Sequence, residues 1–239
     1  MTGRTGMAIV PVALRVEGRS VLVVGAGRIA ARKAAPLVAA GAEVTVVAPE
    51  HTPAMDAVPV TARRRRPFTP DDLEGVRLVI TATGDPTVDG AVFAEAERRR
   101  VWCNAADDPA HCSVILPAVT RRHGVTVAIS TGGRSPAVAS WLRRRIDALL
   151  DDTTGTVIDV ATAVREQMRA AGRPTEVPGW ADVLDNQALA LAAAGRRDDL
   201  ERAFTTALGL RPDGTGGPGA ALTTPPSPSP GTVGIGDRP

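Results

Sequence analysis

Short apolar runs alternate with longer segments of helical periodicity between about residues 11 and 130. Runs rich in valine, leucine and isoleucine predict strands at Ser20–Val24, Glu43–Val47, Arg77–Thr81, Val101–Asn104 and Val125–Ser130. Apolar positions that recur every three or four residues predict helices at Arg28–Ala40 and Thr87–Arg99. Thr69-Pro70 predicts a short helix, since threonine caps helices and proline fits their first turn. This alternation is typical of a parallel α/β sheet covered by helices.

The pattern changes after Gly133, where β-branched runs disappear. Ser135 and Pro136 predict the N-cap and first turn of a helix that ends near Leu150. Further amphipathic helices are predicted at Thr156–Ala171, Trp180–Ala194 and Asp198–Leu208. From residue 211 onwards proline, glycine, serine and threonine dominate, which predicts a disordered tail because such a composition cannot bury a core.

One glycine-rich motif joins the first predicted strand to the first predicted helix, and it reads Val21-Leu-Val-Val-Gly25-Ala-Gly27-Arg-Ile-Ala30. In such a motif Gly25 allows a tight turn, Gly27 leaves room for a pyrophosphate, and Ala30 lets the helix pack close to the strand. The N-terminus of the helix then offers free N–H groups to the anion. We favour a dinucleotide site of the Rossmann type over a plain glycine-rich turn, because the motif lies between a strand and a helix.

Composition narrows the possible functions. The chain has 239 residues, of which 44% are hydrophobic and only 3% aromatic, so aliphatic side chains must form its core. A net charge of +2 does not argue for nucleic acid, and no 18-residue apolar run indicates a membrane helix. Two cysteines make no disulfide framework, and the N-terminus does not resemble a signal peptide. We therefore expect a cytoplasmic protein without a membrane or nucleic-acid partner.

Arginine dominates the 28 basic residues, and Lys33 is the only lysine. The run Arg63–Arg66 has two interpretations, a polyanion site or a solvated edge strand, and the composition favours the edge strand. Trp102 and Trp180 are expected to be packing residues.

Several segments, in this order, resemble the precorrin-2 dehydrogenase/sirohydrochlorin ferrochelatase family, the N-terminal module of siroheme synthases. Besides the glycine motif, which extends to Arg32-Lys33, they are Pro11–Arg19, Gly41–Glu50, Leu78–Thr83, Asn104–Pro109 and Ile129–Pro136. The ordered set is specific, since general Rossmann proteins lack the Asn-x-x-Asp and Ser-Thr-Gly-Gly-x-Ser-Pro segments.

The resemblance implies NAD-dependent oxidation of the tetrapyrrole precorrin-2 to sirohydrochlorin, and in some members Fe²⁺ insertion. It also implies a homodimer. The expected domains are an NAD-binding Rossmann domain (1–112), a dimerisation and substrate-cleft region (113–150), a helical domain (151–210) and the disordered tail (211–239). Two other functions stay open, namely a chelatase without the redox step and a non-catalytic NAD-sensing regulatory domain.

Asp107 is the candidate catalytic residue. It follows a predicted strand, at the carboxyl edge where α/β ligand sites lie, and its carboxylate could take the proton when NAD⁺ takes the hydride. The resemblance assigns this role to the aspartate of Asn-x-x-Asp, and Asn104 is its partner in substrate binding. The alternative is that Asp107-Asp108-Pro109 is only a turn, and for Asp108 we favour that reading.

A second glycine-rich loop opens the helix at Pro136, and its backbone N–H groups could hold carboxylates of the substrate. A plain helix cap with turn glycines is the alternative. The candidate substrate-binding residues of this loop are Thr131, Gly132, Gly133, Arg134 and Ser135.

The remaining cofactor contacts come from the resemblance, which places them at Arg28, Ile29, Pro49, Glu50 and Thr83. The choice of NAD over NADP rests on it as well, because no acidic residue ends the second strand. Asp89 departs from the family pattern, where asparagine is expected, and leaves the loop after Thr83 in question.

Cys103, His111 and Cys112 invite a metal-site interpretation. Neither C-x-x-C nor H-x-x-x-H spacing is present, so no dedicated metal site is predicted.

Overall fold

A computed structural model describes residues 9–210 of the chain. The predicted tail therefore lies outside the described residues. The chain divides into two compact units. The first contains the described residues up to Thr120 together with Thr126–Arg145, and the second contains Arg121–Val125 and the described residues from Ile146 onwards.

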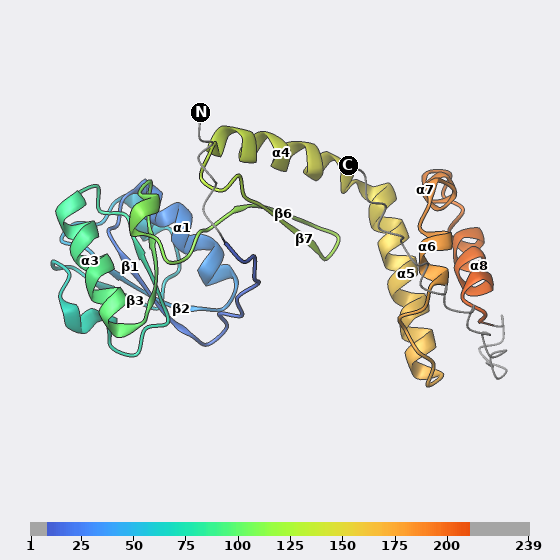
Figure 1. The fold of residues 1–239 in the computed structure, drawn as a ribbon, viewed down its shortest axis with the longest axis horizontal. Coiled ribbons are helices and arrows are strands. Elements are labelled where there is room, and N and C mark those ends of the chain that lie inside the picture. Colours follow the sequence, from blue (N-terminus) through green and yellow to red (C-terminus); the bar gives the residue numbers. More distant parts are fainter. Residues whose placement is uncertain (1–8, 211–239) are drawn as a thin grey trace, which may run out of the picture. The chain divides into compact units, whose positions relative to one another are not determined.

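A five-stranded parallel sheet forms the centre of the first unit, in the order β3-β2-β1-β4-β5 (Figure 1). Its strands are β1 (Ser20–Val24), β2 (Glu43–Val47), β3 (Ala62–Arg64), β4 (Leu78–Thr81) and β5 (Trp102–Ala105). The middle strands are almost continuously buried, as expected when helices cover both faces of a parallel sheet. The predicted parallel α/β fold is confirmed, and β1 and β2 have the predicted bounds.

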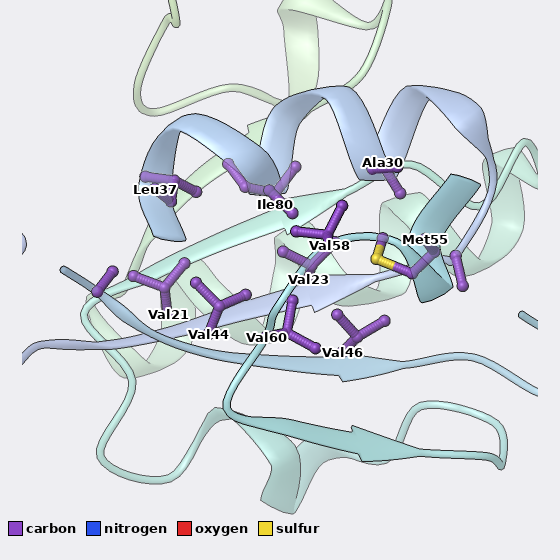
Figure 2. Close-up of a cluster of buried hydrophobic side chains, with 14 of the residues drawn as sticks. Val21, Val23, Ala30, Leu37, Val44, Val46, Met55, Val58, Val60 and Ile80 are labelled. Carbon is purple, nitrogen blue, oxygen red and sulfur yellow. The ribbon is translucent and has the colours of Figure 1, made fainter. Parts of the chain in front are cut away.

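Alternation along the strands builds two cores. Val21 and Val23 of β1 face α1 (Arg28–Ala39), where Figure 2 shows them below Ala30 and Leu37. The intervening Leu22 and Val24 belong to the opposite core, with α3 (Pro86–Arg99). Fully burying one such side chain contributes about 1.5–3 kcal/mol. The two cores fix α1 and α3 against opposite faces of the sheet and thereby place the loops at its carboxyl edge.

Short elements complete the covering of this sheet. The helix predicted at Thr69 is η1 (Pro70–Leu73), closed by a capping box between Thr69 and Asp72. Two further one-turn helices are α2 (Pro53–Asp56) and η2 (Pro109–His111).

The arginine run begins in the edge strand β3, as favoured, but its side chains are not merely solvated. Arg64 and Arg66 both donate to the buried carboxylate of Asp72, at 2.5 and 2.6 Å. Arg63 donates to three backbone carbonyls, among them that of Val58 at 2.6 Å. These arginines therefore connect the edge strand to neighbouring segments. Their acceptors are the buried carboxylate of Asp72 and backbone carbonyls close to the strand.

Beyond the sheet, β6 (Ala118–Arg122) and β7 (Val125–Ile129) form a two-stranded ribbon. His123 and Gly124 between them both have positive φ, 49° and 75°, as a tight hairpin turn requires. The predicted helix at Pro136 follows as α4 (Pro136–Leu149).

Four helices make the second unit, namely α5 (Asp152–Ala170), α6 (Gly179–Val183), α7 (Asn186–Ala193) and α8 (Arg197–Ala207). Helix α5 begins four residues before its predicted start, because Asp151 caps the N–H of Thr154. The helix predicted over Trp180–Ala194 is wrong as a single element. Asp185 accepts from two N–H groups and so begins a new helix at residue 186.

The two tryptophan predictions have different outcomes. Trp180 packs edge-on against Phe204, with ring centroids 5.9 Å apart, as predicted. Trp102 does not pack, since it is 54% exposed at the start of the edge strand β5.

Candidate dinucleotide and catalytic site

The turn after β1 requires glycine at its first position. Gly25 has a φ of +103°, and a Cβ there would lie 2.4 Å from the carbonyl oxygen of Ala82. Its N–H also donates to the carbonyl of Val47, at 2.9 Å. Gly25 therefore joins the ends of β1, β2 and β4 at one point, which no larger residue could do without moving the backbone.

Gly27 and Ala30 differ from Gly25 in what surrounds them. Gly27 is the N-cap of α1, and a Cβ there would meet no atom within 4 Å, so the space beside it is open. Ala30 is fully buried against the sheet (Figure 2). Arg28 and Ile29 are exposed in the first helical turn, where no acidic residue and no capping side chain competes for the free N–H groups. The turn fits a pyrophosphate group.

A loop after β2 is attached to this turn by Thr52. The Thr52 hydroxyl donates to the carbonyl of Ala26 at 2.7 Å, and its N–H donates to the same oxygen at 3.2 Å. Sequence reasoning missed Thr52, although Thr-Pro is a helix-start signal and Thr52 does cap α2. Pro49 and Glu50 lie exposed in this loop, so both are accessible to a bound nucleotide.

His51 in the same loop has a completely buried side chain. Neither ring nitrogen has a hydrogen-bond partner, and the nearest carboxylate oxygen, of Asp56, is 3.9 Å away. Burial, together with the nearby Arg65, lowers the pKa of His51.

The loop after β4 is ordered by Asp89. One carboxylate oxygen of Asp89 accepts from the Thr83 hydroxyl at 2.8 Å, from the Thr83 N–H at 3.3 Å, and from the Thr81 hydroxyl. The acceptor that asparagine would offer is thus supplied by aspartate. The departure at residue 89 leaves this loop well ordered, with Ala82 held against Gly25.

Asn104, at the end of β5, is buried and turned inward. Its side-chain oxygen accepts from Nζ of Lys33 at 2.9 Å, and its amide donates to the carbonyl of Val114 at 2.9 Å. A weaker contact reaches Sγ of Cys112 at 3.6 Å. These contacts occupy the amide, so Asn104 is placed to hold Lys33 and the loop after β5.

Asp107 lies two residues beyond β5 and is exposed. Its φ of +61° is in the left-handed region, which costs a non-glycine residue about 1 kcal/mol and which aspartate tolerates better than most. The preceding Ala106 donates to the carbonyl of Thr81 at 2.8 Å, which fixes this segment to β4. Asp107 is therefore presented to solvent at the same sheet edge as Gly25.

Asp108 is occupied by its own segment. Its carboxylate caps the N–H of Ala110 at 3.2 Å and lies 2.6 Å from Nδ1 of His111. The hydrogen bond with His111 holds the pKa of Asp108 below its usual range. This geometry fits the turn role predicted for it.

The second glycine-rich loop is closed by its own hydrogen bonds. The Thr131 hydroxyl accepts from the Ser135 N–H at 3.1 Å, and Gly132 and Gly133 both have positive φ. Ser135 caps Val138 of α4 at 3.3 Å, and Arg134 is exposed. These hydrogen bonds shape the loop and cap α4.

Metal ligands do not gather in the described part of the chain, where no group of three or more His, Cys, Asp or Glu side chains could hold an ion. Cys103 and Cys112 are free, and burial raises the pKa of the Cys103 thiol to about 12. Within residues 9–210, no helix has the length and apolar character needed to cross a membrane. A cavity of about 440 Å³ lies at the amino ends of β1, β4 and β5, away from the glycine turn.

A parallel sheet with this glycine turn defines a protein of the dinucleotide-binding Rossmann class. Residues 12–118 match a family described as putative NAD(P)-binding, and residues 122–149 match one described as sirohaem biosynthesis protein central. The chain is similar to siroheme synthases, in agreement with the ordered motifs. It is 35% identical to a siroheme synthase of Photorhabdus laumondii over 82% of this chain and 43% of that protein.

A second siroheme synthase matches this chain to a similar extent. A siroheme synthase of Methylococcus capsulatus is 37% identical over 84% of this chain and 44% of its own length. The chain spans less than half the length of these curated relatives. Among solved structures, SirC, a precorrin-2 dehydrogenase, matches with a TM-score of 0.66 and 23% identity, over 83% of this chain and all of that one. That likeness supports the fold.

Proposed function

We propose that this protein oxidises precorrin-2 to sirohydrochlorin, with NAD⁺ as the electron acceptor. One observation carries the proposal, namely that the glycine turn after β1 and the Asp107 segment after β5 lie at the same carboxyl edge of one sheet. A dehydrogenase needs a dinucleotide and an acid–base group side by side. Relatives named siroheme synthase and precorrin-2 dehydrogenase support the choice of substrate.

The dinucleotide is proposed to bind across the turn, with its pyrophosphate on the N-terminus of α1. The open space beside Gly27 supports this position. The preference for NAD over NADP rests on the family and not on a carboxylate at the end of β2. The proposed contacts are Gly25, Gly27, Arg28, Ile29, Ala30, Pro49, Glu50 and Thr83.

Oxidation of precorrin-2 removes a hydride and a proton. Bound NAD⁺ supplies the hydride acceptor. The Asp107 carboxylate accepts the proton, since it is exposed at the sheet edge and no described contact commits it to a turn as His111 does Asp108. Asn104 then acts on the substrate side by holding the loop that carries Asp107.

The loop Thr131–Ser135 is proposed to bind substrate carboxylates. Gly132 and Gly133 have no side chains and have positive φ, so their backbone N–H groups are accessible to an anion. The neighbouring Arg134 is exposed. The five residues proposed here are Thr131, Gly132, Gly133, Arg134 and Ser135.

Iron insertion is a second proposed reaction, in which Fe²⁺ is a substrate and sirohydrochlorin releases two pyrrole protons. The same exposed carboxylate could accept them, which favours one site for both steps. A chelatase without oxidation leaves the intact glycine turn without a purpose, and an NAD-sensing domain leaves Asp107 without one.

A homodimer in the cytoplasm completes the proposal. Helix α4 exposes Val138 and Trp141, 45% and 47% accessible and three residues apart on one face. A two-stranded ribbon such as β6–β7 is marginally stable alone, so a partner's surface would stabilise this region. Two free cysteines fit a reducing compartment.

The test is an anaerobic turnover assay with precorrin-2 and NAD⁺, followed by the absorbance of NADH and sirohydrochlorin, with NAD⁺ binding measured by calorimetry. NAD⁺ binding with turnover supports the dehydrogenase. Binding without turnover supports the sensing domain and overturns the proposal. Sirohydrochlorin with Fe²⁺ and no NAD⁺ tests iron insertion separately.

A further inference from the structure

Lys33 is unusual in this chain because every other basic residue of the Lys/Arg type is arginine. It lies in the second turn of α1, on the side that faces the carboxyl edge of the sheet, and it is half-buried. Its ammonium donates to the buried Asn104 side chain at 2.9 Å, across 71 positions of sequence. The single lysine of the chain is thus held at the carboxyl edge of the sheet, where the catalytic site is proposed.

Burial and three nearby charged or titratable groups act on this ammonium. Burial lowers the pKa of Lys33, while the carboxylate of Asp107 and the thiol of Cys112 oppose that change and Arg32 adds to it. Among these groups, Asp107 is the carboxylate that acts on Lys33. The Lys33 ammonium therefore interacts electrostatically with the proposed base Asp107, while its hydrogen bond to Asn104 fixes its position.

We propose that Lys33 is a positioning residue for Asp107, with its ammonium anchored on Asn104, which lies three residues before Asp107 at the same edge of the sheet. This inference rests on the proposed function, because it gives Lys33 a part in the step that Asp107 performs. Asp107 is exposed, and among the described residues no hydrogen bond or ion pair holds its carboxylate. A fixed cation nearby attracts the carboxylate and so favours one position of its side chain.

The alternative is that Lys33 only ties α1 to β5. Two properties separate the alternatives. A structural tie needs the Lys33–Asn104 hydrogen bond but no charge coupling to Asp107. A positioning residue needs its positive charge at the pH of the reaction, so its loss by deprotonation must lower activity.

The first experiment follows the titration of the only lysine by NMR, with ¹³C placed at its ε carbon and no lysine in any purification tag. We expect one resonance, with a pKa below that of an exposed lysine. Asp107→Asn should lower it further, since the opposing carboxylate is gone. Asp108→Asn is the matched control, and its effect should be much smaller because Asp108 is paired with His111. Equal titration in wild type and Asp107→Asn would overturn the inference.

The second experiment measures the pH dependence of precorrin-2 oxidation. Lys33→Met, which suits a helix and removes the charge, should lower kcat about 10- to 100-fold, the usual range for a misplaced catalytic group, with unchanged NAD⁺ affinity. Wild-type kcat should fall as pH rises through the Lys33 pKa. Lys33→Arg stays charged throughout and should lack this fall.

The failures are distinguishable. If Lys33 and Asp107 are coupled by NMR but Lys33→Met turns over at the wild-type rate, the positioning role is wrong. If Asp107→Asn itself is fully active, the proposed function is wrong while the measured coupling stands. Circular dichroism of each variant checks that it is folded.

Discussion

The two units of this chain bury different kinds of side chain. In the described residues, the polar residues that are buried as a whole all belong to the first unit, and they are Asp72, Thr81, Asp89, Asn104 and Thr120. The buried side chain of His51 belongs to the same unit. The core of the second unit is made of side chains such as Val160, Val164, Met168 and Phe204. Burying a polar side chain destabilises the fold unless the side chain is hydrogen-bonded. Buried and hydrogen-bonded polar side chains therefore mark the places where the fold holds loops in a fixed position. The comparison indicates that the first unit carries the chemistry and the second contributes packing.

The largest effect on activity is expected from a substitution of Asp107 in the first unit. Asp107→Ala should lower precorrin-2 oxidation by roughly 10²- to 10⁴-fold, the usual contribution of a positioned acid–base group. NAD⁺ affinity should barely change, because the pyrophosphate is proposed to bind at the glycine turn and not at Asp107. Turnover assays measure the rate of precorrin-2 oxidation, and calorimetry measures the NAD⁺ affinity. Asp108→Ala serves as the neighbouring control, and an equal loss there would mean that the wrong carboxylate has been chosen.

A change in the second unit should affect stability instead. Phe204 is completely buried, and Phe204→Ala should destabilise that unit by about 3–5 kcal/mol through lost burial and a cavity. Denaturant unfolding followed by tryptophan fluorescence is suitable, because Trp180 lies against Phe204. NAD⁺ affinity per folded molecule should stay at the wild-type value. A variant that keeps its stability but loses NAD⁺ binding would contradict the division of roles.

Within the glycine turn, two substitutions separate folding from binding. Gly27→Asp should remove NAD⁺ binding while the fold remains, since its side chain enters open space where the pyrophosphate is proposed to lie. Gly25→Ala should destabilise the first unit, because its Cβ would collide with Ala82. Calorimetry and thermal unfolding of both variants provide the check. Unchanged affinity in folded Gly27→Asp would refute the site.

Acid stability of the first unit should depend on Asp72. Burial alone raises the pKa of Asp72, but hydrogen bonds from Arg66, Thr69 and Arg64 outweigh it and hold the pKa well below its usual range. A depressed pKa means that this stabilisation is complete above about pH 4 and is lost as the pH falls further. Asp72→Asn should cost about 1–3 kcal/mol at neutral pH and flatten the acid side of the stability curve. Urea unfolding from pH 7 to pH 3 measures this, and parallel curves would exclude the assignment.

The smallest effect is expected at Asp89. Asp89→Asn keeps an acceptor for the Thr81 and Thr83 hydroxyls, so the melting temperature should change by only a few degrees. A large loss of NAD⁺ affinity in this variant would show that the negative charge itself matters to the loop.

Much of the fold could be predicted because its signals are local. Ser20–Val24 and Glu43–Val47 are valine-rich runs with glycines close to their ends, and their bounds were predicted correctly. Prediction was poorer where one capping side chain decides the outcome, as Asp185 does between α6 and α7. Edge strand β3 was assigned from its charge pattern, but the partners of its arginines were not foreseen.

The sequence by itself determined the parallel sheet, the glycine turn after β1 and the presence of an aspartate after β5, because apolar periodicity and turn chemistry act over a few residues. Only the tertiary structure decided that Lys33 meets Asn104, that Thr52 holds Ala26 and that Asp89 orders Thr83. These contacts join residues from 6 to 71 positions apart. They form because parallel strands bring their carboxyl ends to one edge, where polar side chains without a local partner must find one across the loops.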